Sequence, residues 1–428
     1  MSMGKQGVKT AVPKLRFPEF RNLGGWATYS LSEISKFVTE RVGTTSCIPY
    51  TVTSGVGLVS QEEKLGRTIA GNSLKNYVVL QSNDFAYNKS ATKAFPQGFI
   101  VRYTGNERAA VPNSIFSCFR VDQSIILPAF IENLFLANLH GKWLRSRLAV
   151  GSRAHGSLQV SDDDLMTLPV PLPSGTGSLA EQQKIADCLT SLEEVIAAQG
   201  RKVEALKVHK RGLMQQLFPL EGEALPRLRF PEFRDAPEWA ERPLCQVIEV
   251  ASGQVDPTEA PYCDFPHVGG ENIESETGSL VGLKSAREDG VTSGKYLFDE
   301  KDVLYSKIRP ILNKVAVPDF NGICSADIYP IRPSSSDITR QFLVYLLRSA
   351  SFVEYATKHS ERGKIPKINR EALAAYGARL PQQVEQQRIA DCLFSVDTAI
   401  TAESAQLTVL KTHKQGLMQQ LFPAQRAG

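Results

Sequence analysis

The side chains best suited to binding chemistry in this sequence are basic residues that lie in short polar segments. The candidates for contacts with a nucleic acid are Lys89, Lys93, Arg153, His155, Lys307, Arg309, Arg362, Lys364 and Lys367. Lysine and arginine bind phosphates, and arginine can also bind guanine through two hydrogen bonds. Because loops on a rigid scaffold often carry binding residues, we expect these segments to contact DNA. For each residue taken singly, an ordinary solvated surface charge is the alternative.

The motifs of a self-sufficient DNA-modifying enzyme are absent from the sequence. It contains no Asn-Pro-Pro-Tyr or Asp-Pro-Pro-Tyr tetrapeptide, and no GxxxxGK[ST] phosphate loop. The six histidines form no HExxH pair and the seven cysteines lie far apart, so no metal site is predicted. The acidic run 162–164 follows Ser161 as in a helix capping box, and Asn369 is an equivalent N-cap. We therefore expect no catalytic, cofactor-binding or metal-binding residues in this chain.

The composition is that of a globular protein. The chain has 428 residues, 42% of them hydrophobic, which is enough for two or three domains. Its formal net charge of +4 permits nucleic-acid binding without requiring it. No segment resembles a signal peptide or a membrane span, and the dispersed cysteines indicate reduced thiols. We therefore expect a cytoplasmic protein.

The sequence is internally duplicated. PKLRFPEFR at 13–21 returns as PRLRFPEFR at 226–234, with Trp26 matched by Trp239. Downstream, the segment from 181 to 219 matches the segment from 385 to 423 without an insertion or deletion. Between these blocks the spacing drifts, because NDFAYNKS at 83–90 and KDVLYSKI at 301–308 match at a different offset. The pattern predicts two divergent domains, each followed by a spacer of constant length.

The predicted fold class is α+β, with four segments in the chain. We expect a first domain at 13–173, a central spacer helix at 178–219, a second domain at 226–381 and a C-terminal spacer helix at 382–423. Short alternating apolar runs between turn signals indicate strands in both domains. Longer stretches at 130–148 and 339–359 indicate helices.

Each spacer carries an apolar seam with heptad spacing. The seam residues are Ile185, Leu189, Leu192, Ile196, Val203, Leu206, Leu213 and Leu217 in the first, and Ile389, Leu393, Val396, Ile400, Leu407, Leu410, Leu417 and Leu421 in the second. Gln199 and Lys210 fill two polar slots that Glu403 and Lys414 fill in the second copy, which indicates a specified register. A 40-residue helix is about 60 Å long and cannot bury its seam alone. We expect the two helices to pack antiparallel about a pseudo-two-fold axis, with separate core helices as the alternative.

The ends and interior of the spacers carry further signals. Each helix is expected to end at a Phe-Pro pair, at Pro219 and Pro423, because proline cannot continue the helical hydrogen bonding. Gly212 and Gly416 lie inside the pattern, where glycine costs about 1 kcal/mol relative to alanine. Either a close approach of another helix or simple tolerance would explain them.

From about Pro13 to Pro423 the chain resembles the specificity subunits of type I restriction-modification systems. The resemblance is carried by EQQKIADCL and EQQRIADCL at the helix starts, GLMQQLFP at the helix ends, YSKIRP at 305–310 and GKIPKIN at 363–369. It implies two target-recognition domains, each of which reads one half of a bipartite DNA sequence, with antiparallel helices that fix the gap. It also implies two modification subunits that hold S-adenosylmethionine and methylate adenine. The assembly can include restriction subunits that cleave DNA with ATP and Mg²⁺, and none of these cofactors would contact this chain.

Three functions follow from these patterns. In the leading one, the two domains differ in sequence and therefore read different half-sites, so that the target is asymmetric. Because the two domains are linked, binding of one raises the effective concentration of the other at the same duplex, provided that the spacer matches the distance between the half-sites. The second is a methyltransferase or nuclease in its own right, which would need the missing motifs. The third is a coiled-coil scaffold that binds protein instead of DNA. The outer faces of the spacer helices are the expected partner surface.

Overall fold

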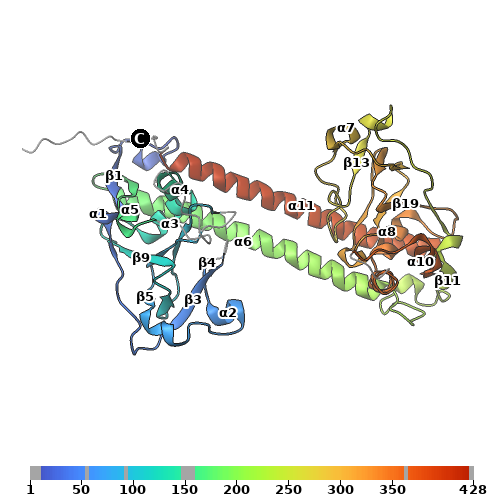
Figure 1. Cartoon of the computed structure of the whole chain (residues 1–428), viewed down its shortest axis with the longest axis horizontal. Coiled ribbons are helices and arrows are strands. Elements are labelled where there is room, and N and C mark those ends of the chain that lie inside the picture. The colour runs from blue at the N-terminus through green and yellow to red at the C-terminus, as the bar shows by residue number, and fades with distance from the viewer. Residues whose placement is uncertain (1–10, 54–56, 91–94, 146–159, 361–364, 424–428) are drawn as a thin grey trace, which may run out of the picture. The chain divides into compact units, whose positions relative to one another are not determined.

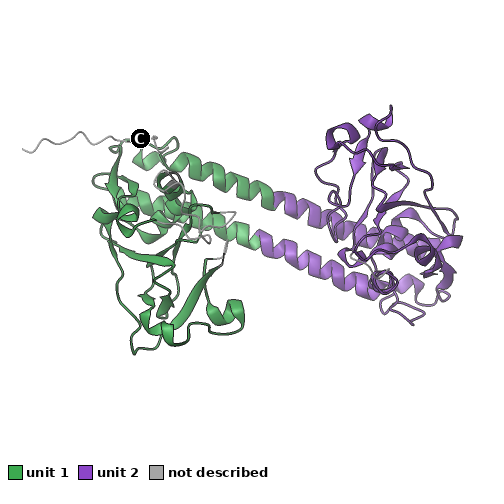
Figure 2. Ribbon diagram, in the orientation of Figure 1, with its two compact units in different colours: residues 1–198, 407–428 green, residues 199–406 purple. Residues whose placement is uncertain are grey.

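The computed structural model describes residues 11–53, 57–90, 95–145, 160–360 and 365–423. The chain divides into two compact units, residues 1–198 with 407–428, and residues 199–406 (Figure 2). Two long helices, α6 (Ser178–Leu217) and α11 (Gln383–Leu421), are labelled in Figure 1. Each contributes one part to the first unit and the other part to the second (Figure 2).

The described part of the first unit contains three sheets. In the smallest, β1 (Trp26–Ser30) pairs antiparallel with β10 (Pro169–Pro173), and Trp26 lies opposite Pro173. One four-stranded sheet has the order β2 (Ser35–Phe37), β9 (Phe116–Val121), β6 (Phe85–Asn88), β7 (Phe99–Arg102). The other has the order β4 (Gly57–Ser60), β3 (Ile48–Thr53), β8 (Ala109–Val111), β5 (Val78–Leu80), in which β3 and β8 are parallel.

The second unit repeats this topology strand for strand. There β11 (Ala240–Pro243) pairs with β20 (Gly377–Leu380). One sheet has the order β12 (Ile248–Val250), β19 (Ile328–Pro333), β16 (Val303–Ser306), β17 (Val315–Ala316). The other has the order β14 (Lys284–Ser285), β13 (Pro266–Val268), β18 (Gly322–Cys324), β15 (Tyr296–Phe298), again with one parallel pair, β13 and β18. The duplication therefore extends through the segments whose sequences have drifted apart.

Short helices complete each unit. The first has α1 (Leu31–Ile34), α2 (Gln61–Leu65), α3 (Pro128–Leu136), α4 (Leu139–Arg145) and α5 (Asp162–Met166), and the second has α7 (Ala286–Asp289), α8 (Arg340–Arg348), α9 (Ala350–Lys358) and α10 (Arg370–Ala375). The expected caps are confirmed, because Ser161 Oγ accepts the Asp164 N–H at 2.9 Å and Asn369 Oδ1 accepts the Ala372 N–H at 2.8 Å. Each long helical stretch expected from the sequence is instead two helices. The stretch 339–359 breaks at Ser349, whose hydroxyl caps α9.

The end of a spacer helix completes the core of each unit. In the first unit the indole of Trp26 lies 5.7 Å from the ring of Phe130 and 6.5 Å from that of Phe422, just beyond α11. In the second unit Trp239 packs in the same way between Phe342 and Phe218, which follows α6. Burial of these aromatic side chains stabilises the attachment of helix to domain by several kcal/mol.

The spacer helices run antiparallel within each unit, which confirms the packing expected from the sequence. In the first unit Ile185 and Leu189 of α6 share a core with Leu421 of α11, and further along α6 Glu193 binds Lys414. In the second unit α6 and α11 are joined by Lys210 with Asp397 and by Gln199, which donates to the Glu403 carbonyl at 2.9 Å. Every seam residue named above is buried or half-buried.

Gly212 and Gly416 lie inside the spacer helices. A Cβ built on Gly212 or Gly416 would meet no atom of the described chain within 4 Å, so neither spacer helix approaches the other closely at these glycines. Across the described ranges, no helix has an apolar stretch long enough to cross a membrane.

Candidate nucleic-acid interface

The repeated residues at the start of each spacer helix hold the domain in place. Buried Glu181 accepts hydrogen bonds from the Arg16 guanidinium at 2.8 and 2.7 Å and from the Trp26 indole at 3.2 Å. In the second unit Glu385 accepts the same bonds from Arg229, at 2.8 and 2.7 Å, and from the Trp239 indole at 3.3 Å. The two parallel hydrogen bonds of such a pair fix the orientation of the arginine and the glutamate, and they also pair the two charges. These motif residues therefore fix the first strand of each domain to the start of the spacer helix that follows it.

Both units place a candidate lysine at the same point in the fold. Lys89 follows β6 and its N–H donates to the Ile115 carbonyl at 2.9 Å. Lys307 follows β16 and its N–H donates to the Asp327 carbonyl at 3.0 Å. In each unit the partner carbonyl belongs to the turn that enters the neighbouring strand, β9 or β19. The correspondence between the two lysines is thus one of structure as well as sequence.

The ammonium groups of both lysines are already bonded inside their own unit. Lys89 Nζ lies 3.1 Å from Asp162 Oδ1, at the first residue of α5. Burial works against the charge of Asp162, but hydrogen bonds from Ser117 and Lys89 outweigh it and hold the pKa of this carboxyl below its usual value. Lys307 Nζ donates to the Ala326 carbonyl at 2.8 Å and lies over the Tyr329 ring. Either ammonium group would have to leave these partners to bind a phosphate.

Three of the candidate cations in the second unit come together through backbone pairing. The Arg309 N–H donates to the Pro366 carbonyl at 2.8 Å, and the Ile368 N–H donates to the Lys307 carbonyl at 3.1 Å. This pairing sets Lys367 beside the segment 307–309. The side chains of Arg309 and Lys367 are exposed. The Arg309 guanidinium makes no hydrogen bond or ion pair with any residue in the described part of the chain.

The other candidates cannot be placed. Lys93, Arg153, His155, Arg362 and Lys364 lie outside the described residues. Among the described residues, no group of three His, Cys, Asp or Glu side chains is arranged to hold a metal ion.

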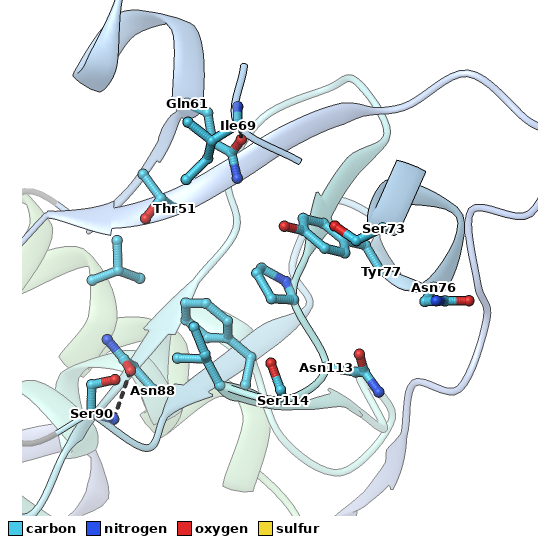
Figure 3. Close-up of a pocket in the computed structure, with 14 residues that line it drawn as sticks. Thr51, Gln61, Ile69, Ser73, Asn76, Tyr77, Asn88, Ser90, Asn113 and Ser114 are labelled. Carbon is cyan, nitrogen blue, oxygen red and sulfur yellow. Dashed lines mark hydrogen bonds between the residues drawn. The ribbon is translucent and has the colours of Figure 1, made fainter. Parts of the chain in front are cut away.

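A cleft of about 440 Å³, lined by both polar and apolar residues, lies beside Lys89 in the first unit. Figure 3 shows Asn88 and Ser90 on one side of it, with Asn113 and Ser114 on the neighbouring turn. Asn88 Oδ1 accepts the Ser90 N–H at 2.8 Å, the bond that the figure marks. The lining side chains are all uncharged. Amides can bind adenine through two hydrogen bonds, so this cleft offers base-reading chemistry that a search for basic residues missed.

Comparison with known proteins places these features in a family context. Residues 237–412 match the model of the type I restriction modification DNA specificity domain. The chain is 27% identical over 332 residues to the type I restriction enzyme EcoDI specificity subunit of Escherichia coli, covering 73% of this chain and 71% of that protein. It is 26% identical to the MjaVIII specificity subunit of Methanocaldococcus jannaschii, covering 60% and 61% of the two chains.

Solved structures share the fold of the chain. A crystal structure of the S subunit of a type I restriction-modification system from M. genitalium superposes with a TM-score of 0.58 at 14% identity, and covers 97% of this chain and all of that one. A chain from a structural study of complex assembly and conformational transition in a type I system gives 0.57 at 17% identity, and covers 96% of this chain and all of that one. The likeness confirms the duplicated α+β fold with two long helices.

Proposed function

We propose that the chain is a specificity subunit of a type I restriction-modification system, which selects the DNA target for partner subunits and catalyses neither methylation nor cleavage itself. The match to a DNA specificity domain supports DNA reading over a scaffold that binds only protein. The observation that carries the proposal is the repetition of one topology around two different sets of loop residues.

Each unit would read one half of a bipartite target. The strands β6 and β16 occupy the same place in the two units, yet the residues that follow them differ, Lys89 and Ser90 in the first and Lys307, Ile308 and Arg309 in the second. Different residues after matching strands support two different half-sites and hence an asymmetric target. In this proposal the antiparallel helices set the gap between the half-sites.

The partners would be double-stranded DNA, two modification subunits and, in the restricting assembly, restriction subunits. S-adenosylmethionine, ATP and Mg²⁺ would bind to those partners and not to this chain. Exposed apolar side chains on the spacer helices support a protein partner there. Val195 and Val409 in the first unit are 51% and 60% exposed, and Phe394 in the second is 66% exposed.

Exchange of one domain tests this assignment. The pairing of β1 with β10 brings both ends of the first domain together, so residues 25–173 can be replaced by the corresponding domain of another specificity subunit. Sequencing of methylated adenines in cells with the modification subunits should show a change in one half of the motif only. The reciprocal exchange of residues 240–380, bounded by the β11–β20 pair, should change only the other half. If one exchange altered both halves, independent reading would be ruled out.

A further inference from the structure

The turn that follows Lys307 presents an apolar tip between basic side chains. The 3-10 helix η6 (Pro310–Leu312) forms this turn. Ile311 is 65% exposed and Leu312 is 37% exposed, although both are large aliphatic residues. Arg309 precedes them, and Lys367 lies on the segment paired with 307–309. An exposed aliphatic tip beside cations suits a partner that offers both negative charge and an apolar contact.

The backbone of the turn is held in an uncommon conformation at both of its ends. Arg309 has a φ of 48° and Asn313 a φ of 49°, in the left-handed region that side chains other than glycine rarely adopt. Such conformations persist where the surroundings enforce them, and they cluster at binding sites. Here the Arg309 N–H is fixed by the Pro366 carbonyl at 2.8 Å and the Asn313 N–H by the Pro310 carbonyl at 2.9 Å.

The base of the turn is anchored in the core of the second unit. Asn313 Nδ2 donates to Glu276 Oε2 at 3.2 Å and to the Arg348 carbonyl at 3.4 Å. Arg348 itself is only 9% exposed, and its guanidinium donates to the Thr277 carbonyl at 2.9 Å. The tip is therefore displayed on a rigid support, as a site that recognises a fixed partner requires.

Charge decides which partner fits this tip. Arg309 is exposed, and its guanidinium has no partner in the described part of the chain. The turn would therefore favour a polyanion over an apolar protein surface. On DNA, the apolar group that a side chain can contact in the major groove is the C5 methyl of thymine.

We propose that this turn enters the major groove and that Ile311 reads a thymine by packing against its C5 methyl group, with Arg309 bound to a neighbouring phosphate. The inference rests on the proposed function and adds a base-reading residue to the second unit. Burial of one methyl group corresponds to about a four-fold change in affinity. Ile311 would therefore tune one position of a half-site and leave the rest unchanged.

Replacement of thymine by deoxyuridine, which lacks only the C5 methyl, tests the proposal. The complex of this chain with its modification subunits is titrated with duplexes in which each thymine of the second unit's half-site is replaced in turn. One replacement should weaken binding of the wild-type complex about four-fold. Ile311→Ala should bind the normal duplex about four-fold or more weakly and lose its sensitivity at that position, while Ile311→Val should keep part of it. Val317→Ala, at another exposed aliphatic of the same unit (43% exposed), should retain the full wild-type sensitivity.

The outcomes separate the two proposals. Three outcomes would overturn the role of Ile311 and leave the proposed function intact. They are specific binding without sensitivity at any thymine, a half-site made only of G·C pairs, and an Ile311→Ala complex that keeps the wild-type sensitivity. Loss of assembly with the modification subunits in Ile311→Ala would assign the tip to a protein interface instead. Failure of the wild-type complex to prefer its methylated motif over unrelated DNA would count against the proposed function itself.

Discussion

Lys210 Nζ lies 2.6 Å from Asp397 Oδ1, and this pair joins α6 to α11 inside the second unit. The other carboxylate oxygen of Asp397 accepts a hydrogen bond from the Tyr345 hydroxyl at 3.0 Å and lies 3.8 Å from Arg348 Nη1. Tyr345 and Arg348 belong to α8, so one carboxylate connects both spacer helices to the domain of the second unit.

In the first unit, Lys414 takes the place of Lys210 but makes a more exposed ion pair. There Lys414 binds Glu193, whose side chain is 56% exposed. Counted from the N-caps of α3 and α8, Asn133 and Leu136 occupy the places of Tyr345 and Arg348. Asn133 donates to the carbonyl of Ala129 in its own helix, and Leu136 is 60% exposed. The domain of the second unit thus has a polar attachment to the spacer that α3 does not reproduce.

Asp397→Ala should lower the free energy of unfolding of the second unit by about 2 kcal/mol or more, because it leaves the buried Arg348 and the largely buried Lys210 without their counter-charge. Glu193→Ala, the matched change in the first unit, should cost less than about 1 kcal/mol because that pair is more exposed. Urea unfolding followed by hydrogen exchange in each unit would measure both. Equal losses in the two units would contradict the asymmetry.

The sequence predicted the spacers well because their information is local and periodic. Ile185 and Leu189 repeat at heptad spacing, and the matching segments at 181–219 and 385–423 contain no gap, so helix and register could both be inferred. The break at Ser349 was missed because a serine inside an apolar stretch can be either a helix residue or a cap.

The binding surface was harder to infer because it depends on contacts between distant segments. Arg309 and Lys367 were chosen as candidates, but their proximity comes from backbone pairing of 307–309 with 366–368. The internal bonds of Lys307 and the exposure of Ile311 also depend on tertiary packing. Basic residues mark a nucleic-acid surface in sequence, whereas amides such as Asn88 and aliphatic residues such as Ile311 carry no such mark.

Lengthening both spacers should change the gap between half-sites and leave the half-sites themselves unchanged. One heptad inserted in α6 between Gln199 and Lys210, and one at the matching place in α11 between Glu403 and Lys414, would add about 10 Å to each helix and preserve the apolar seam. This corresponds to about three base pairs of duplex. Sequencing of methylated adenines would report the new gap. An unchanged gap in a stably assembled variant would exclude the helices as the spacing element.

Arg309→Ala should weaken binding to every DNA sequence by a similar factor, because the proposed contact is to a phosphate. The slope of log affinity against log salt concentration should become less negative by about 0.9 for one lost phosphate contact. The pattern of deoxyuridine sensitivity should stay as in the wild type. Arg227→Ala, whose side chain is 62% exposed in the segment after α6, serves as the matched loss of a positive charge. A changed base preference at one position, with an unchanged salt slope, would mean that Arg309 reads a base instead.

His140 should make the first unit sensitive to acid. The imidazole is 2% exposed and lies edge-on to the ring of Phe135 at 5.8 Å. Burial, opposed weakly by the backbone of Gly98, lowers the pKa of His140 to about 4 from 6.5. As the pH falls, the unfolded chain therefore takes up this proton before the folded chain does. The stabilisation is complete above about pH 6.5 and is lost as the pH falls to about 4, by about 3 kcal/mol.

The contribution of this one group can be isolated by comparing variants, because carboxyl groups titrate in the same range. His140→Leu keeps an apolar side chain of similar size at the site and removes the proton. Between pH 6.5 and 4, the free energy of unfolding of the first unit should fall less steeply in this variant than in the wild type. His209→Asn, at an exposed histidine of α6, should keep the wild-type slope. If His140→Leu also kept that slope, the buried imidazole would not be the source of the acid sensitivity.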